Sequence, residues 1–148
     1  MRIRKARATD LAPIKTLLVE LLNTIENKAD FDVDSAIKNC RDLFKDSDSC
    51  MFVAEEHGDI KGFINFTVRK TIIHPHPSGL IDELIVAESA RGSGVGKRLI
   101  AKAIQQCRLM GCSEVEVSTE KSNTNARRFY KACGFEEDAV LLEFELKG

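Results

Sequence analysis

The sequence has 148 residues, with 22 basic and 23 acidic side chains and a net charge of −1. This length suits one domain, over residues 1–148, with a core large enough to fold without disulfides or metal. The balanced charge gives no indication of a nucleic-acid or anionic-membrane partner. No apolar stretch near the N-terminus is long enough for a signal peptide or a membrane span, so we expect a cytoplasmic protein.

The cysteine pattern argues against a disulfide framework and against a zinc site. There are five cysteines, an odd number, with no CxxC pair and no clustered histidine beside them. We therefore expect reduced, structural thiols and no bound metal.

The first fifty residues are dominated by helical periodicity. A short strand is expected at 3–6, after which Thr9 and Asp10 offer helix-capping oxygens and Pro13 suits a first helical turn. Apolar residues at helical spacing predict a first helix over 11–25, and a second helix fits 35–44.

The middle of the chain reads as strands. Residues 51–54 and 60–68 are separated by turn chemistry and predict a hairpin. Two prolines make 74–79 a loop, and 80–87 is the next strand.

Helices and strands alternate in the remaining third. A long helix is predicted over 94–110 and ends at Gly111, followed by a strand around 114–117. A helix over 123–133 and a closing strand over 141–146 complete the chain. A hairpin followed by strands that alternate with helices indicates an α/β (α+β) fold, with a mixed sheet covered on both faces.

The turn Arg91-Gly92-Ser93-Gly94-Val95-Gly96 follows a strand and opens a helix, which is a favourable place for an anion. Glycines let the backbone approach a phosphate, and the first amide N–H groups of the helix point at it, with the positive end of the helix dipole behind them. Arg91 can add a charge-assisted hydrogen bond. A tight strand-to-helix turn with no ligand explains the same residues about equally well.

Spacing excludes two common phosphate loops. Walker A needs four residues between its first Gly and its Gly-Lys pair, but only three separate Gly92 from Gly96. The dinucleotide fingerprint would need glycine or alanine at Lys97 or at Leu99, and neither position has one.

The remaining pattern is Arg-x-x-Gly-x-Gly, formed by Arg91, Gly94 and Gly96. It resembles the signature of the GCN5-related N-acetyltransferase (GNAT) superfamily, and residues 84–88 resemble the family's cofactor-contacting strand. A second segment, over 123–135, resembles the family's Asn-x-x-Ala-x-x-Phe-Tyr-x-x-x-Gly-Phe pattern.

The resemblance implies a mixed, mostly antiparallel sheet of about six to seven strands with about four helices, in the order β-α-α-β-β-β-α-β-α-β. It also implies acetyl-coenzyme A as co-substrate, held by the strand, the turn and the second segment. The residues expected to bind it are Leu84, Ile85, Val86, Arg91, Gly92, Ser93, Gly94, Val95, Gly96, Lys97, Asn123, Ala126 and Tyr130.

Acetyl transfer to an amine needs a base, an oxyanion donor and an acid for the leaving thiolate. The resemblance assigns the acid to Tyr130, and the Val86 N–H is a plausible oxyanion donor. Asp82 and Glu83 are the candidate bases. Strand alternation is expected to send one to each face, so that only one faces the cleft. Asp82 is slightly favoured because alternation along the strand places it on the same face as Leu84 and Val86. Glu83 stays a candidate.

The acceptor is expected to be a small cationic amine, such as a polyamine, an aminoglycoside or a lysine-like amine. Between residues 10 and 50 nine acidic side chains outnumber five basic ones, and a negative rim would steer a cation. A solvated helix surface explains these acids equally well. The alternatives are a protein N-terminal or lysine acetyltransferase and a coenzyme A-binding module without catalysis. A homodimer is expected by analogy alone.

Two loop histidines, His74 and His76, are weaker candidates for contact with substrate or for proton removal. A solvated loop position is the more ordinary interpretation of both.

Overall fold

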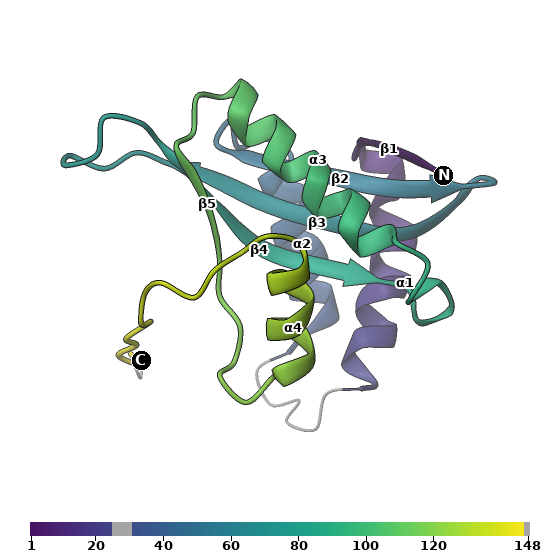
Figure 1. Ribbon diagram of the computed structural model, residues 1–148. Helices are drawn as coiled ribbons and strands as arrows, with labels where there is room; N and C mark the ends of the chain where they lie inside the picture. Colours follow the sequence, from purple (N-terminus) through teal and green to yellow (C-terminus); the bar gives the residue numbers. More distant parts are fainter. Residues whose placement is uncertain (25–30, 147–148) are drawn as a thin grey trace. The chain divides into compact units, whose positions relative to one another are not determined.

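The structure, a computed structural model, describes residues 1–24 and 31–146. Its contacts divide the chain into two compact units, Met1–Val117 and Ser118–Gly148. Figure 1 labels the α-helices and strands of both units.

The first unit contains a five-stranded sheet in the order β1-β2-β3-β4-β5. Neighbouring strands are antiparallel except β4 and β5, which are parallel. The elements are β1 (Arg2–Lys5), η1 (Ala8–Asp10), α1 (Leu11–Leu22), α2 (Val33–Leu43), β2 (Ser49–Glu56), β3 (Asp59–Arg69), β4 (Ser78–Val86), η2 (Glu88–Ala90), α3 (Val95–Leu109) and β5 (Glu114–Val117). The predicted elements of this unit are confirmed to within a few residues at their ends, and the end of the first predicted helix, at 25, lies outside the described residues.

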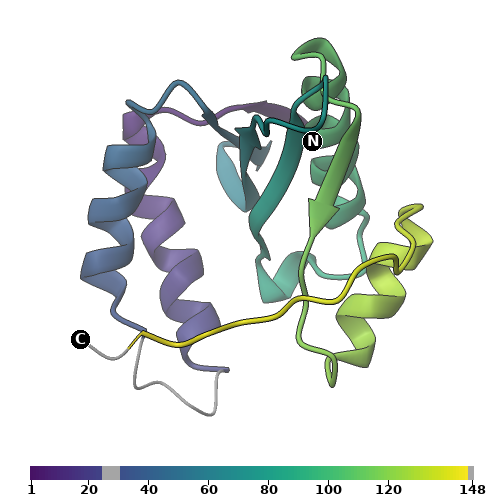
Figure 2. The same cartoon turned by 90° about the vertical axis from the view of Figure 1, so that its left-hand side faces the viewer.

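Helices cover both faces of this sheet, as expected. Figure 2 shows α1 and α2 on one face and α3 on the other. The core lies in these two layers, where Ile14 of α1, Ile64 and Phe66 of β3, and Leu99 and Ile100 of α3 are at most 1% exposed. Burial of such large apolar side chains is the main favourable term in folding.

Asp10 precedes α1 as predicted, but the prediction that its side chain caps that helix is wrong. Its carboxylate makes no capping bond to α1. It accepts two hydrogen bonds from the Arg4 guanidinium (both N–O distances 2.8 Å) and one from the Arg7 backbone N–H (2.9 Å). Arg4 also binds Glu55 of β2. A buried guanidinium needs carboxylate partners, so this ion-pair network has drawn Asp10 away from the helix.

Over residues 118–146 the second unit contains one helix, α4 (Thr124–Ala132). The predicted closing strand over 141–146 is wrong, because these residues have no regular structure. Apolar residues alternate with acidic ones along this segment, but no strand in the described residues pairs with it. Its side chains Leu142, Phe144 and Leu146 are therefore 87–89% exposed. A strand is stable only when paired, and the sheet therefore has five strands instead of the expected six to seven.

Among the described residues, none of the helices is both long and apolar enough to cross a bilayer.

Candidate functional site

A β-bulge interrupts β4 at Asp82. In the pairing of β3 with β4, Asn65 lies opposite Glu83, while the next residue, Phe66, lies opposite Ile81. Asp82 is therefore an extra residue without a partner on β3. A bulge of this kind shifts the side-chain alternation by one residue. Odd- and even-numbered residues therefore exchange faces of the sheet across the bulge.

The bulge places both carboxylates on the same face of the sheet. Asp82 accepts from the Thr67 hydroxyl (3.3 Å), and Glu83 accepts from the Asn65 carboxamide (2.8 Å). Asn65 and Thr67 are two residues apart on a stretch of β3 that pairs with β2 without interruption, and so share a face. The expectation that Asp82 and Glu83 point to opposite faces is wrong, because it assumed an uninterrupted strand.

The shared face is the one that α1 and α2 cover. Met51, which lies opposite Asn65 on β2, contacts Cys40 of α2 through its sulfur (3.8 Å). Burial raises the pKa of both carboxyls, and for Glu83 the nearby Asp82 raises it further while the hydrogen bond from Asn65 lowers it. Both side chains also keep solvent-exposed surface. A substrate can therefore reach a pair of carboxylates whose proton affinity is above that of a free carboxylate.

Beyond the bulge, one edge of β4 is left open. β5 pairs only with Ser78–Ile81, and no strand in the described part of the chain pairs with 82–86 on that side. The Ala87 N–H donates to the Lys61 carbonyl (2.8 Å), and Val86 lies opposite Gly62. Because bonded and non-bonded pairs alternate along an antiparallel ladder, the N–H and C=O groups of Leu84 and Val86 point to the open edge.

Ile85 differs from its two neighbours. It lies opposite Phe63, and the same alternation directs its backbone groups to β3. Its side chain is 8% exposed and belongs to the core. Ile85 therefore offers no group to the open edge, although the resemblance included it among the contacts.

The open edge leads directly into the glycine-rich turn. Gly92 and Gly94 have φ of +79° and +88°, a conformation that glycine adopts without strain. Gly94 is the N-cap residue of α3 and has no side chain to cap it, so the N–H groups of Val95, Gly96 and Lys97 lack acceptors within the helix. The first residue with such an acceptor is Arg98, whose N–H donates to the Gly94 carbonyl.

The turn has the shape and charge that a pyrophosphate needs. A Cβ added at Gly92 or Gly94 would meet nothing within 4 Å, so the space above both glycines is open. Arg91 and Lys97 are exposed beside it. Ser93 contributes less than expected, because its hydroxyl and its N–H are both directed to the Ala90 carbonyl. Open space, three amide donors and two cations match a multiply charged anion.

The other predicted site residues lie in the second unit. The Asn123 side chain caps α4 by accepting the Ala126 N–H (3.0 Å). Tyr130 packs edge-on against Phe129 and Phe135 at 5.2 and 5.7 Å between ring centroids. Burial, with a contribution from Cys133, raises the pKa of Tyr130, so its phenol stays protonated at neutral pH.

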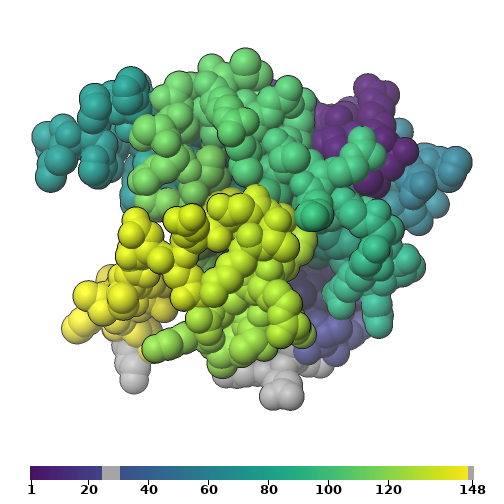
Figure 3. Space-filling view, in the orientation of Figure 1, coloured from purple at the N-terminus to yellow at the C-terminus, as the bar shows by residue number. Residues whose placement is uncertain are grey.

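The loop before β4 projects from the sheet, and Figure 3 shows it as the teal lobe on the left. Its Ile72 and Ile73 are almost fully exposed, and the side chains of His74 and His76 lie in water beside them. The two histidines are at the start of β4, whereas the glycine-rich turn follows its end.

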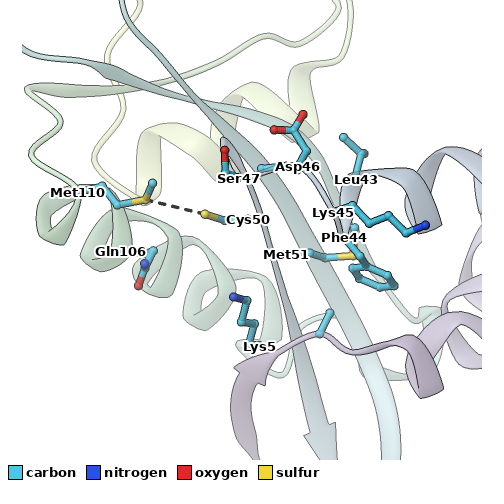
Figure 4. A pocket seen from close by; sticks show the side chains of 12 residues that line it. Lys5, Leu43, Phe44, Lys45, Asp46, Ser47, Cys50, Met51, Gln106 and Met110 are labelled. Carbon is cyan, nitrogen blue, oxygen red and sulfur yellow. Dashed lines mark hydrogen bonds between the residues drawn. The ribbon is translucent and has the colours of Figure 1, made fainter.

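Two hollows beside the sheet are described here by their linings, and neither lining includes the glycine-rich turn. One, of about 320 Å³, lies where the ends of β1, α2 and α3 meet the start of β2. Figure 4 shows Cys50 and Met110 on its wall, joined by a sulfur contact of 3.8 Å. The other, of about 470 Å³, is lined by Thr67, the residue that bonds Asp82. Only the second hollow adjoins a predicted site residue.

The sequence profile of the acetyltransferase (GNAT) family matches residues 14–135, which is most of the chain. The chain belongs to this family. It is therefore an acyltransferase, and the resemblance drawn from the two sequence segments is confirmed. The match begins within α1 and includes all of α4, so it covers every described element between them.

Three relatives illustrate the breadth of the family. The chain is 26% identical to the uncharacterized N-acetyltransferase YhfO of Bacillus subtilis, over 97% of this chain and 95% of that one. It is 28% identical to the aminoalkylphosphonate N-acetyltransferase of Salmonella typhimurium, over 91% and 84%. Among solved structures, an aminoglycoside N-acetyltransferase in complex with CoA has a TM-score of 0.85 at 23% identity, over 99% and 95%, which establishes a common fold.

Two residues next to the candidate carboxylates, Asn65 and Ser49, were not predicted from the sequence. Asn65 is 4% exposed and donates to Glu83, and the Ser49 hydroxyl donates to the Asn65 side-chain oxygen Oδ1 at 3.2 Å. Asn65 had a signal, because it is the one polar residue in the apolar run Phe63-Ile64-Asn65-Phe66. A buried amide in a central strand needs polar partners.

Proposed function

We propose that this protein transfers an acetyl group from acetyl-CoA to a primary amine by direct attack in a ternary complex. The observation that carries the proposal is the continuity of the open β4 edge with the glycine-rich turn, beside two carboxylates on one face. Acetyl-CoA supplies an activated thioester, and the protein holds and orients it. No metal is needed for this chemistry.

The donor is proposed to bind along β4 and α3. Its extended arm would pair with the outward N–H and C=O groups of Leu84 and Val86, as an added strand does. Its pyrophosphate would accept from the N–H groups of 95–97, with charge from Arg91 and Lys97. The relative solved in complex with CoA has the same fold, which supports this assignment.

Glu83 is our proposed base, with Asp82 as the alternative. An amine with a pKa near 10.4 is almost entirely protonated at neutral pH, so a carboxylate of raised pKa assists by taking its proton, directly or through water. Glu83 is preferred because Asn65 holds its carboxylate, whereas Asp82 is held only by the longer contact with Thr67. The Val86 N–H is the proposed oxyanion donor, and Tyr130 the proposed acid for the leaving thiolate.

We still propose a small cationic acceptor, but the negative charge that attracts it is assigned to different residues. Several acids between residues 10 and 50 are already engaged: Asp10 with Arg4, and Glu20 with the Glu88 N–H (2.5 Å). Others, at 26 and 30, lie outside the described residues. The Asp82 and Glu83 pair provides negative charge at the reacting centre itself, which attracts an ammonium group.

A panel of amines with a thiol-release assay tests both the reaction and the acceptor class. Polyamines, aminoglycosides and lysine-like amines are expected to turn over faster than aminoalkylphosphonates, which carry an anionic group. Turnover of aminoalkylphosphonates or other anionic amines alone would refute the charge argument.

The same assay separates the remaining alternatives. Turnover confined to peptide N-termini or lysine side chains would favour a protein acetyltransferase. CoA binding with no thiol release from any acceptor would favour a module without catalysis. The homodimer and the cytoplasmic location stay predictions, for sedimentation and for fractionation.

A further inference from the structure

We propose that Asn65, oriented by Ser49, is a positioning residue that holds the Glu83 carboxylate in place for proton removal. Its carboxamide joins the two side chains: the Asn65 Nδ2 donates to Glu83 Oε2 at 2.8 Å, and the Ser49 hydroxyl lies 3.2 Å from Asn65 Oδ1. This inference rests on the proposed function, since it assigns a role to a residue that acts through the proposed base.

The burial of Asn65 makes these hydrogen bonds obligatory. Only 4% of the residue is exposed, and it lies in β3 between strands β2 and β4, which carry Ser49 and Glu83. A buried amide that loses a partner costs the full desolvation of that group. A buried amide requires polar partners, and here those partners are Ser49 and the candidate base Glu83.

The two hydrogen bonds of the Asn65 amide support each other. The ionised Glu83 carboxylate can only accept, so it takes the Asn65 Nδ2, and the Ser49 hydroxyl holds the other end of the amide by donating to Oδ1. A donor favours the charged form of a carboxylate, so Glu83 is kept ready to accept a proton. The bond holds Oε2, so in the proposed reaction Oε1 is the atom that takes the proton.

The groups around Glu83 determine how its titration responds. Asp82 on its own strand raises its pKa, Asn65 on β3 lowers it, and the Cys40 thiol of α2 lies within electrostatic range. Removal of the Asn65 donor leaves burial and the Asp82 charge unopposed. The pKa of Glu83 then rises, and the acidic limb of the pH profile of kcat/KM moves to higher pH.

The test compares Asn65→Leu with Thr67→Val, a matched loss of the donor to Asp82. We expect Asn65→Leu to lower kcat/KM by about ten- to a hundredfold, the usual effect of a lost bond to a charged group, and to move the acidic limb to higher pH. Thr67→Val is expected to leave the midpoint of that limb in place. Ser49→Ala is expected to act in the same direction as Asn65→Leu but more weakly, and Ser49→Thr to restore the wild-type profile.

Calorimetric titration with CoA distinguishes this inference from the proposed function. CoA affinity equal to wild type in Asn65→Leu, together with a shifted limb, supports the positioning role. A loss of rate with no shift in Asn65→Leu and in Ser49→Ala would overturn it and leave acetyl transfer standing. A limb that shifts in Thr67→Val alone would overturn it in favour of Asp82 as base. If Asn65→Leu does not fold, as its circular dichroism would show, the Ser49→Ala and Ser49→Thr profiles decide alone.

Discussion

Substitution of Gly94 by valine tests the proposed phosphate site, and α3 provides its own control. Gly94 and Gly111 flank opposite ends of this helix, with φ of +88° and +81°, and a Cβ at either would meet nothing within 4 Å. Valine in the left-handed region costs about 1–2 kcal/mol or more at both places. Gly94→Val and Gly111→Val should therefore lower the free energy of unfolding by similar amounts in urea titrations.

CoA affinity is where the two variants should differ. At Gly94 the new side chain occupies the space proposed for a phosphate, beside the free N–H groups of α3. Each hydrogen bond to a charged group contributes about 1.5–3 kcal/mol. Loss of two such bonds weakens CoA binding by about 3 kcal/mol or more, which is at least about a hundredfold.

Isothermal titration calorimetry measures this difference, with Gly111→Val expected to bind CoA as the wild type does. Equal CoA affinities in the two variants would refute the assignment of the pyrophosphate to this turn.

Three further substitutions have defined outcomes. Tyr130→Phe should lower kcat by roughly ten- to a few hundredfold, because the phenol is the proposed acid, and an unchanged kcat removes that role. Asp10→Asn should cost about 3 kcal/mol at pH 7 by leaving Arg4 short of a partner. The pKa of the Asp10 carboxyl is lowered in the folded state, so this group stabilises the fold above its ordinary pKa, and the stabilisation is lost as pH falls through the folded pKa. The difference in the free energy of unfolding between variant and wild type, measured in urea titrations, should therefore disappear in acid. A difference that stays constant with pH contradicts the ion pair. Gly79→Ala places a Cβ 2.5 Å from the Cys107 sulfur and should lower the melting temperature, which Cys107→Ala should partly restore; a melting temperature equal to wild type means no overpacking.

The elements of the first unit could be predicted because their sequence signals are local. Helical spacing in 11–22 and 95–109 and the hairpin turn at His57 and Gly58 depend only on nearby residues. The same holds for the glycine-rich turn, where positive φ at Gly92 and Gly94 is what their identity predicts.

The rest depends on partners that are distant in the sequence. The bulge at Asp82 follows from the register with β3, and simple alternation therefore assigned the two carboxylates to opposite faces. The segment 141–146 has a strand pattern, but pattern alone does not supply a neighbouring strand. Asp10 had a capping residue's identity, yet Arg4 and Arg7 compete for it.

Hydrogen–deuterium exchange with and without CoA tests the central claim most directly, because the claim concerns particular backbone amides. We expect CoA to slow exchange at the N–H groups of Leu84, Val86 and residues 95–97, and to leave β1 and β2 unaffected. Protection confined to the hollow beside Cys50, or no protection anywhere at saturating CoA, would contradict the account.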